Sequence, residues 1–360
     1  MSTVLSGDQA YQALRQGRSL EGAIIEGDCG SPDTLPGPPI EHPVRADGAE
    51  FRGALNLTDH RFLAPVCFRG ARFLGPALHL WRVDFENHFD FSGVEVHASD
   101  TLFSQSQFLG AETSFRAACF AGTITNFRKV RFAGRSVSFR DASFEGERTQ
   151  FRETRFEGGA VDFSAARFLS SHETSFRMAE FHGAEAELSG AELSSRMIDF
   201  NETVFAPVTR MIGCRISGNL VFCNVDLDRL ELRRTDVSRC EFRAPLRFGR
   251  RSVLGLATRS VVGDELRCPP GEQLQVAELY RQIRGYYLQR SLPYEADWRD
   301  YRQKRDHKSA WQLYLSELTM RRRAKGRLWP GGLLIPYAAL RELLARRTPT
   351  HVGSWHVAPR

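Results

Sequence analysis

The stretch FRDASFEGERTQFRETRFEGGAVDFSAARF, residues 139–168, decides the fold, because its phenylalanines recur in steps that alternate between five and seven residues. The alternation continues without error through twelve rings: Phe103, Phe108, Phe115, Phe120, Phe127, Phe132, Phe139, Phe144, Phe151, Phe156, Phe163 and Phe168. Self-similarity at a fixed period is typical of arrays in which each unit stacks on its neighbour. The sequence therefore predicts a repetitive array of 12-residue modules with these twelve rings as its core ladder.

The period of the array excludes ordinary secondary structure. A step of five matches neither the 3.6-residue period of an α-helix nor the two-residue period of a strand. The later positions Phe222, Leu227, Leu232, Val237 and Phe242 keep a step of five, so the step of seven contains two extra corner residues. We expect four short sides to close one coil of two modules, with coils stacked about 4.8 Å apart. Residues 51–250 would then form about eight coils and a rod on the order of 40 Å long.

Segments such as FEGERTQFRETRF (144–156) and NVDLDRLELRRTDVSRCEF (224–242) give the array a family resemblance. They resemble the pentapeptide-repeat family over roughly residues 51–250, in a variant with central Phe and alternating steps of five and seven. The resemblance implies a right-handed quadrilateral β-helix, a mainly β fold. It carries little information about function.

Both ends of an open solenoid need capping segments, since they expose strand edges and apolar rings. At the N-terminal end, Ser6 is a candidate N-cap for a helix over 6–17, and a strand is expected within 20–28. One face of the first C-terminal helix is predicted to carry Val276, Leu279, Tyr280, Ile283 and Tyr287. The full predicted organisation is an N-terminal cap and Pro-rich loop (1–50), the β-helix (51–250), a linker (251–273), an α-helical hairpin (274–327), and a short helix and tail (328–360).

The cysteine content of the chain indicates which cellular compartment suits it. The seven cysteines are odd in number and scattered without a CxxC pair, which favours a reducing cytoplasm over a disulfide framework or zinc site. We expect neither a cleaved signal peptide nor a membrane span. The segment 277–306 also resembles the helical stretch that follows the repeats in some bacterial pentapeptide proteins, where membrane spans can come next.

The basic charge is concentrated in the last third of the chain. Residues 251–360 contain 20 basic and 10 acidic side chains, whereas residues 51–250 contain 26 and 25. A candidate binding patch precedes an apolar stretch within 321–347 and consists of Arg321, Arg322, Arg323, Lys325 and Arg327. Such a patch suits an anionic membrane, nucleic acid or an acidic protein surface. The alternative is a helix end whose basic residues complement the helix dipole.

No sequence motif for catalysis, metal binding or a cofactor is present, so we expect a protein that is not an enzyme and needs no cofactor. Between the phenylalanines, acidic residues such as Asp141 and Glu145 alternate with arginines such as Arg140 and Arg148. Solvated pairing between neighbouring coils explains this alternation.

The leading hypothesis is a cytoplasmic, non-catalytic scaffold that binds a protein partner, because solenoids offer long rigid surfaces. One alternative comes from the family resemblance: a DNA mimic that binds type II topoisomerases and confers antibiotic resistance. This role requires an acidic surface, because DNA carries one negative charge per roughly 1.7 Å. A second alternative is peripheral membrane association through residues 321–347, and a homodimer remains open.

Overall fold

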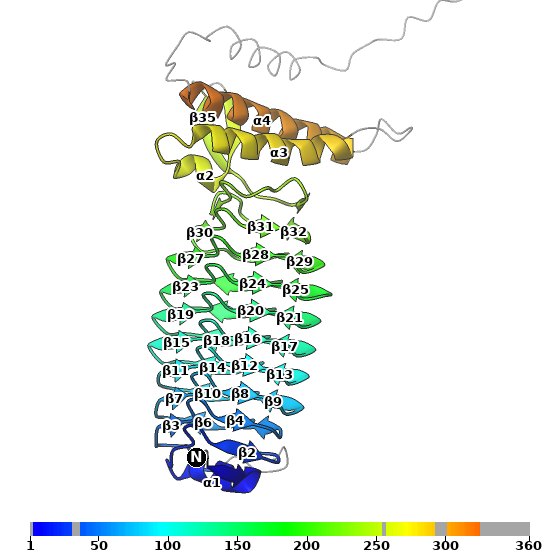
Figure 1. Cartoon of the computed structure of the whole chain (residues 1–360). Coiled ribbons are helices and arrows are strands. Elements are labelled where there is room, and N and C mark those ends of the chain that lie inside the picture. Colours follow the sequence, from blue (N-terminus) through cyan, green and yellow to red (C-terminus); the bar gives the residue numbers. More distant parts are fainter. Residues whose placement is uncertain (1–2, 31–36, 254–256, 292–300, 325–360) are drawn as a thin grey trace, which may run out of the picture.

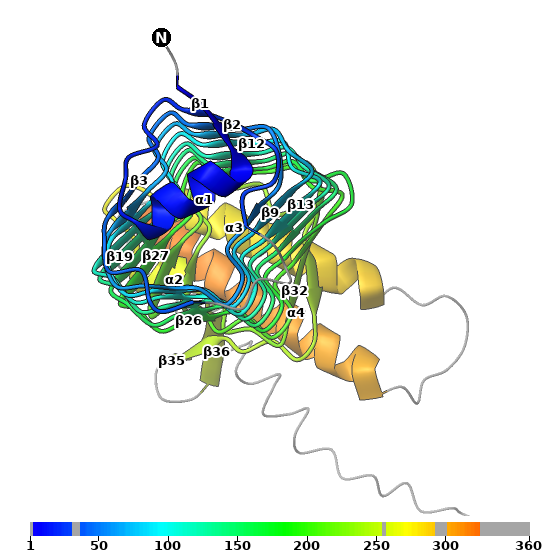
Figure 2. The same ribbon diagram turned by 90° about the horizontal axis from the view of Figure 1, so that it is seen from below.

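The computed structural model describes residues 3–30, 37–253, 257–291 and 301–324, and over these ranges the chain is mainly a parallel β-solenoid. The rod rises from helix α1 (Gly7–Arg15) at one end to helices α3 (Gln273–Ser291) and α4 (Tyr301–Ala324) at the other (Figure 1). Viewed along the rod, the coils lie one behind another, with α1 across the near end (Figure 2). The predicted fold class, a β-helix with a helical extension, is confirmed.

Four sheets form the four faces of the rod, and between residues 50 and 187 the chain visits all four in the same order in every coil. Face 1 contains β1 (Val4–Ser6), β2 (Ile24–Glu26), β4 (Glu50–Phe51), β8 (Arg72–Phe73), β12 (Glu95–Val96), β16 (Cys119–Phe120), β20 (Ser143–Phe144), β24 (Arg167–Phe168), β28 (Glu192–Leu193) and β31 (Arg215–Ile216). Face 2 contains β5 (Leu55–Asn56), β9 (Ala77–His79), β13 (Asp100–Leu102), β17 (Ile124–Asn126), β21 (Arg148–Gln150), β25 (Glu173–Ser175), β29 (Met197–Asp199), β32 (Asn219–Cys223) and β34 (Glu241–Arg243). Face 3 contains β6 (Arg61–Phe62), β10 (Asp84–Phe85), β14 (Gln107–Phe108), β18 (Arg131–Phe132), β22 (Arg155–Phe156) and β26 (Glu180–Phe181). Face 4 contains β3 (Val44–Arg45), β7 (Val66–Cys67), β11 (Phe89–Asp90), β15 (Glu112–Ser114), β19 (Ser136–Ser138), β23 (Ala160–Asp162), β27 (Glu185–Glu187), β30 (Val208–Arg210) and β33 (Leu230–Glu231).

The strand register confirms that one coil takes two modules. Phe120 of β16 lies opposite Phe144 of β20, and Phe144 lies opposite Phe168 of β24, all in parallel. The predicted boundary at residue 51 is too late, because β2 already pairs with β4, with Ile25 opposite Phe51. The array therefore begins before the phenylalanine rhythm does, since Ile25 fills the same inward position.

The core is a set of stacked rings. All twelve predicted phenylalanines are completely buried. Rings in one column stack nearly parallel, with centroids 4.9 Å apart for Phe127 and Phe151. Rings in neighbouring columns meet edge to face, as Phe139 and Phe151 do at 5.6 Å and 90°. Both geometries are favourable for aromatic pairs, so each ring is held by neighbours above, below and beside it.

The corners between faces 3 and 4 require glycine. Gly110, Gly134 and Gly158 each lie two residues after a phenylalanine and stack in successive coils. A Cβ atom on Gly134 would lie 2.1 Å from the carbonyl oxygen of Gly110, and a Cβ atom on Gly158 only 1.5 Å from that of Gly134. The coils can therefore approach to strand spacing here only without side chains. The Phe-x-Gly pattern that marks these corners is visible in the sequence.

Helix α1 covers the N-terminal end as predicted. Ser6 is its N-cap in a reciprocal capping box with Gln9. Ala10, Ala13 and Leu14 are buried against the first coils. The expected strand within 20–28 is β2, and the Pro-rich loop lies partly outside the described residues.

His60 joins α1 to the rod. The Tyr11 hydroxyl lies 2.9 Å from Nε2 of His60, and Nδ1 lies 2.9 Å from the carbonyl oxygen of Thr58. The carbonyl can only accept, so Nδ1 carries the proton and Nε2 accepts from Tyr11 in the neutral ring. Burial lowers the pKa of His60, and the hydrogen bond to Thr58 opposes this only in part.

We expect acid to loosen the N-terminal cap through His60. An unfolded histidine has a pKa of about 6.5 and binds protons more strongly than this buried one, so the stabilisation is complete above that pH and is lost as pH falls below it. The melting temperature should drop between pH 7.5 and pH 5, and less so in His60→Gln, which does not titrate. Equal drops in both proteins would contradict this prediction.

The C-terminal end is closed by structure that the sequence analysis missed. Residues 251–273, predicted to be a linker, contain part of the antiparallel hairpin of β35 (Gly249–Val253) and β36 (Ala257–Val261), as well as helix α2 (Gly263–Leu266). The hairpin strands pair with each other and not with a coil, so they carry no phenylalanine repeat.

Asp264, at the start of α2, provides the hydrogen-bond acceptors that a further coil would otherwise provide. In the preceding coil, the Met211 N–H donates to the carbonyl oxygen of Glu231 at 2.8 Å. One coil later, the N–H groups of Leu232 and Arg233 donate to the two carboxylate oxygens of Asp264, at 2.7 and 2.9 Å. The buried guanidinium of Arg233 also lies 3.4 Å from this carboxylate. The last strand edge is thus satisfied by a side chain.

Asp264→Asn should destabilise the chain by about 1–3 kcal/mol, because it removes one of the two acceptors and leaves a buried donor unpaired. Asp236→Asn is the control, since Asp236 is an exposed aspartate in the same coil as Leu232 and Arg233. Thermal unfolding of both variants measures the difference. A melting temperature of Asp264→Asn equal to that of the control would remove the capping role.

Helices α3 and α4 lie side by side over this end (Figure 1). The predicted face of α3 is confirmed, because all five of its residues, Val276, Leu279, Tyr280, Ile283 and Tyr287, are buried. The column of rings continues into the cap, since Phe242 contacts Tyr286 at 5.7 Å. Both ends of the rod are therefore covered.

Candidate binding groove

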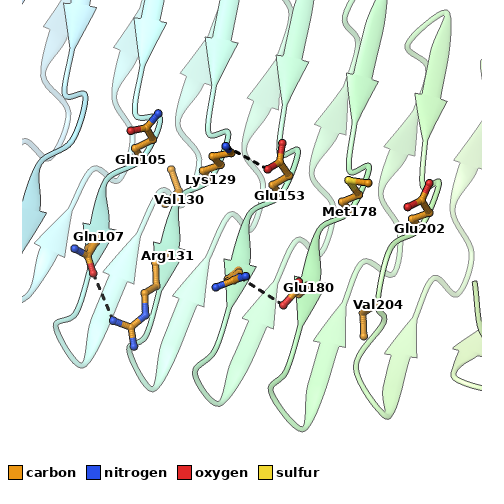
Figure 3. A pocket seen from close by; sticks show the side chains of 11 residues that line it. Gln105, Gln107, Lys129, Val130, Arg131, Glu153, Met178, Glu180, Glu202 and Val204 are labelled. Carbon is orange, nitrogen blue, oxygen red and sulfur yellow. Dashed lines mark hydrogen bonds and ion pairs between the residues drawn. The ribbon is translucent and has the colours of Figure 1, made fainter.

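A groove of about 670 Å³ runs along the corner between faces 2 and 3. Figure 3 shows its walls as two rows of side chains that extend over five successive coils. The corner row consists of Gln105, Lys129, Glu153, Met178 and Glu202. The face row consists of Gln107, Arg131, Arg155, Glu180 and Val204.

The corner row projects outward because of its backbone conformation. All five residues have positive φ, between 57° and 60°. A left-handed residue turns the chain sharply between two short sides, and few side chains adopt it without cost. The N–H of Lys129 donates to the carbonyl oxygen of Arg152 in the next coil at 3.0 Å, which fixes the spacing of the row.

Buried residues separate the two rows, and among them Val130 lines the groove. The Thr154 hydroxyl donates to the Phe127 carbonyl oxygen at 2.7 Å, and the Thr203 hydroxyl donates to the Phe176 carbonyl oxygen at 2.8 Å. These polar groups are satisfied within the rod. The side chains of the two rows therefore determine what the groove can bind.

The walls carry both signs of charge in pairs. Lys129 lies 3.5 Å from Glu153, and Arg155 lies 3.6 Å from Glu180. Slight burial raises the pKa of Glu153, but hydrogen bonds and charges of Arg128 and Lys129 outweigh it and hold this pKa below its usual value. Exposed pairs of this kind contribute less than about 1 kcal/mol each.

Paired charges also cover the other faces, as predicted from the alternation of Arg and Glu. Arg167 pairs with Glu192 at 3.5 Å on face 1, and Arg210 pairs with Glu185 at 3.0 Å on face 4. Each pair joins neighbouring coils. Topoisomerase binding by DNA mimicry, for which an acidic surface is required, stays a hypothesis.

The predicted basic patch is described only in part. Arg321 lies 2.9 Å from Glu317, and Arg323 lies 3.2 Å from the buried Glu265. The structure does not describe the side chain of Arg322. It also does not describe Lys325, Arg327, or the predicted short helix and tail (328–360). Arg321 thus pairs within α4, whereas Arg323 joins α4 to α2, and binding through 321–347 stays a prediction.

The cysteines are free thiols distributed along the rod and its cap. Burial raises the pKa of Cys29 and of Cys214 to about 12, so neither is a thiolate at neutral pH. Within the described ranges, no group of three or more His, Cys, Asp and Glu side chains is placed to hold a metal ion.

Comparison of the chain with protein-family models, with curated proteins and with solved structures gives no match. Among the helices of the described residues, none is long and apolar enough to cross a membrane. The groove was not identified from the sequence, because its two rows lie two residues apart in each coil and become walls only when the coils stack. The one feature of the sequence that could have indicated the groove is Met178, an apolar residue in a row of charged and amide residues.

Proposed function

We propose that this chain is a pentapeptide-repeat protein of a Phe-centred type and acts as a non-catalytic scaffold that binds a protein partner along the side of its rod. The observation that carries the proposal is that both ends of the rod are covered, by α1 and by the α2–α4 cap. The sides of the rod are therefore the extended surface that a partner can contact. A rigid surface loses little conformational freedom on binding, which favours the association of a partner.

The groove is the part of the side that we assign to the partner. It combines two exposed apolar side chains, Met178 and Val204, with charged walls. Binding surfaces of proteins commonly combine an apolar centre with a polar rim.

Site-specific photo-crosslinking in the native host tests this function. A photoreactive amino acid is placed at Gln105 in the groove, at Glu112 on face 4 and at Met197 on face 2, all of which are exposed. We expect one discrete protein adduct, strongest from position 105. Absence of a protein adduct from all three positions, or capture of nucleic acid alone, would exclude a protein-binding scaffold.

A further inference from the structure

Three arginines occupy equivalent positions beside the groove. Arg128, Arg152 and Arg177 each directly precede a corner-row residue, in three successive coils. The N–H of Lys129 donates to the Arg152 carbonyl oxygen, and the N–H of Glu153 donates to the Arg177 carbonyl oxygen, both at 3.0 Å. The three guanidinium groups therefore start from a column with a spacing of about 4.8 Å per coil.

Two of these arginines have an acidic partner one coil further along. Arg128 lies 2.9 Å from Glu153, and Arg177 lies 3.6 Å from Glu202. The equivalent position for Arg152 is Met178, a neutral side chain. Among the residues that the structure describes, no acidic side chain pairs with Arg152. The middle of the column therefore carries an uncompensated positive charge.

The Arg177 side chain adds an unused donor beside this position. Its Nε is buried, and the part of the chain that the structure describes supplies no hydrogen-bond partner for it. A buried donor without a partner is unfavourable, and the Arg177 side chain, which is 40% exposed as a whole, can turn to bring this donor to an incoming acceptor. Arg177 directly precedes Met178, and Arg152 occupies the equivalent position one coil earlier.

The same end of the groove is apolar. Met178 is 40% exposed on the corner row, and Val204 is 40% exposed on the face row. Figure 3 shows Met178 and Val204 at the same end of the groove, on opposite walls. Flexible methionine side chains adapt well to the shape of an apolar partner.

We propose that this end of the groove binds an extended acidic peptide segment of the protein partner, with one apolar side chain between Met178 and Val204 and one carboxylate on Arg152. The inference rests on the proposed scaffold function and deepens it. A carboxylate supplies the charge that Met178 does not, and its second oxygen can accept from Arg177. Glu153, Glu180 and Glu202 line the same groove and disfavour a continuous phosphate backbone, which would bring a negative charge against each of them.

One substitution should remove the binding site without straining the backbone at this corner. Met178→Glu restores the residue type found one coil away on either side, and the backbone already suits it, because φ is 58° at Glu153, 57° at Met178 and 59° at Glu202. The new glutamate should pair with Arg152 and leave the melting temperature unchanged or higher. Met197→Glu is the matched control, because Met197 is a similarly exposed methionine (38%) at the far edge of face 2.

The probe is a displayed library of random 12-residue peptides selected on the full chain, with affinities measured by fluorescence polarisation. We expect enriched peptides with net negative charge around one or two aliphatic or aromatic residues. Their affinity should fall about tenfold or more in Met178→Glu and in Arg152→Ala, and stay within about twofold in Met197→Glu. Affinity should also weaken as salt is raised, since the contact includes an exposed charge pair.

Three outcomes would overturn the inference: no enrichment, enrichment of basic or neutral peptides, or equal binding by Met178→Glu and Met197→Glu. Displacement of the peptide by a short single-stranded oligonucleotide at equal concentration would also overturn it, since the arginine column would then bind phosphate. If Met178→Glu still forms the protein adduct in the crosslinking experiment, the scaffold function stands and only the assignment of this site fails.

Discussion

Phe144→Asp will abolish the cooperative thermal transition of the rod. The Phe144 ring is completely buried and stacks between Phe120 and Phe168, each at 5.2 Å. Removal of a buried ring alone costs about 3–5 kcal/mol. A buried carboxylate without a partner adds several kcal/mol, which in total approaches the stability of a whole domain.

The control for this prediction is Phe144→Leu. Leu193 lies opposite Phe168 in the same column, so the column already accepts leucine. The change should cost about 1.5 kcal/mol or less and keep one sharp transition. Circular dichroism during heating distinguishes the two variants. A native transition in Phe144→Asp would mean that this ring is not part of a dry core.

Gly158→Ala will destabilise the rod by about 3 kcal/mol, although it adds only one methyl group. The new Cβ atom would lie 1.5 Å from the Gly134 carbonyl oxygen, a backbone atom that can move only if two coils separate. The melting temperature should therefore fall by several degrees.

The same substitution at Gly285 is expected to have no destabilising effect. Gly285 lies within α3, and a Cβ atom there would meet nothing within 4 Å. Alanine favours a helix interior over glycine by up to about 1 kcal/mol, so Gly285→Ala should leave the melting temperature unchanged or raise it. If both alanine variants shift the melting temperature equally, the close contact between coils is not the reason that position 158 requires glycine.

The sequence predicted the fold well because the same inward position recurs in every module. The spacing from Phe103 to Phe168 alone predicts the stacked rings, and Ser6 predicts the start of α1 from purely local capping. The C-terminal boundary was predicted less well. Its hairpin and α2 have no repeat, and their positions depend on contacts with the last coil.

The candidate site could not be predicted in the same way. Arg128 and Glu153 are 25 residues apart, and their pairing depends on how many residues each coil and its corners take up. A corner with one more residue would place another side chain opposite each arginine. Only the stacked coils show that Met178 occupies, for Arg152, the position that a glutamate occupies for Arg128 and for Arg177.

The sequence by itself determined that this chain coils, which rings it buries, and where its N-terminal cap helix begins, because these depend on local spacing and on hydrophobic periodicity. The tertiary structure alone decided which outward side chains become neighbours, how Asp264 ends the last strand, and where a groove opens. The physical reason is that stacking brings together residues about one coil apart, and their charges and shapes interact only across that short distance.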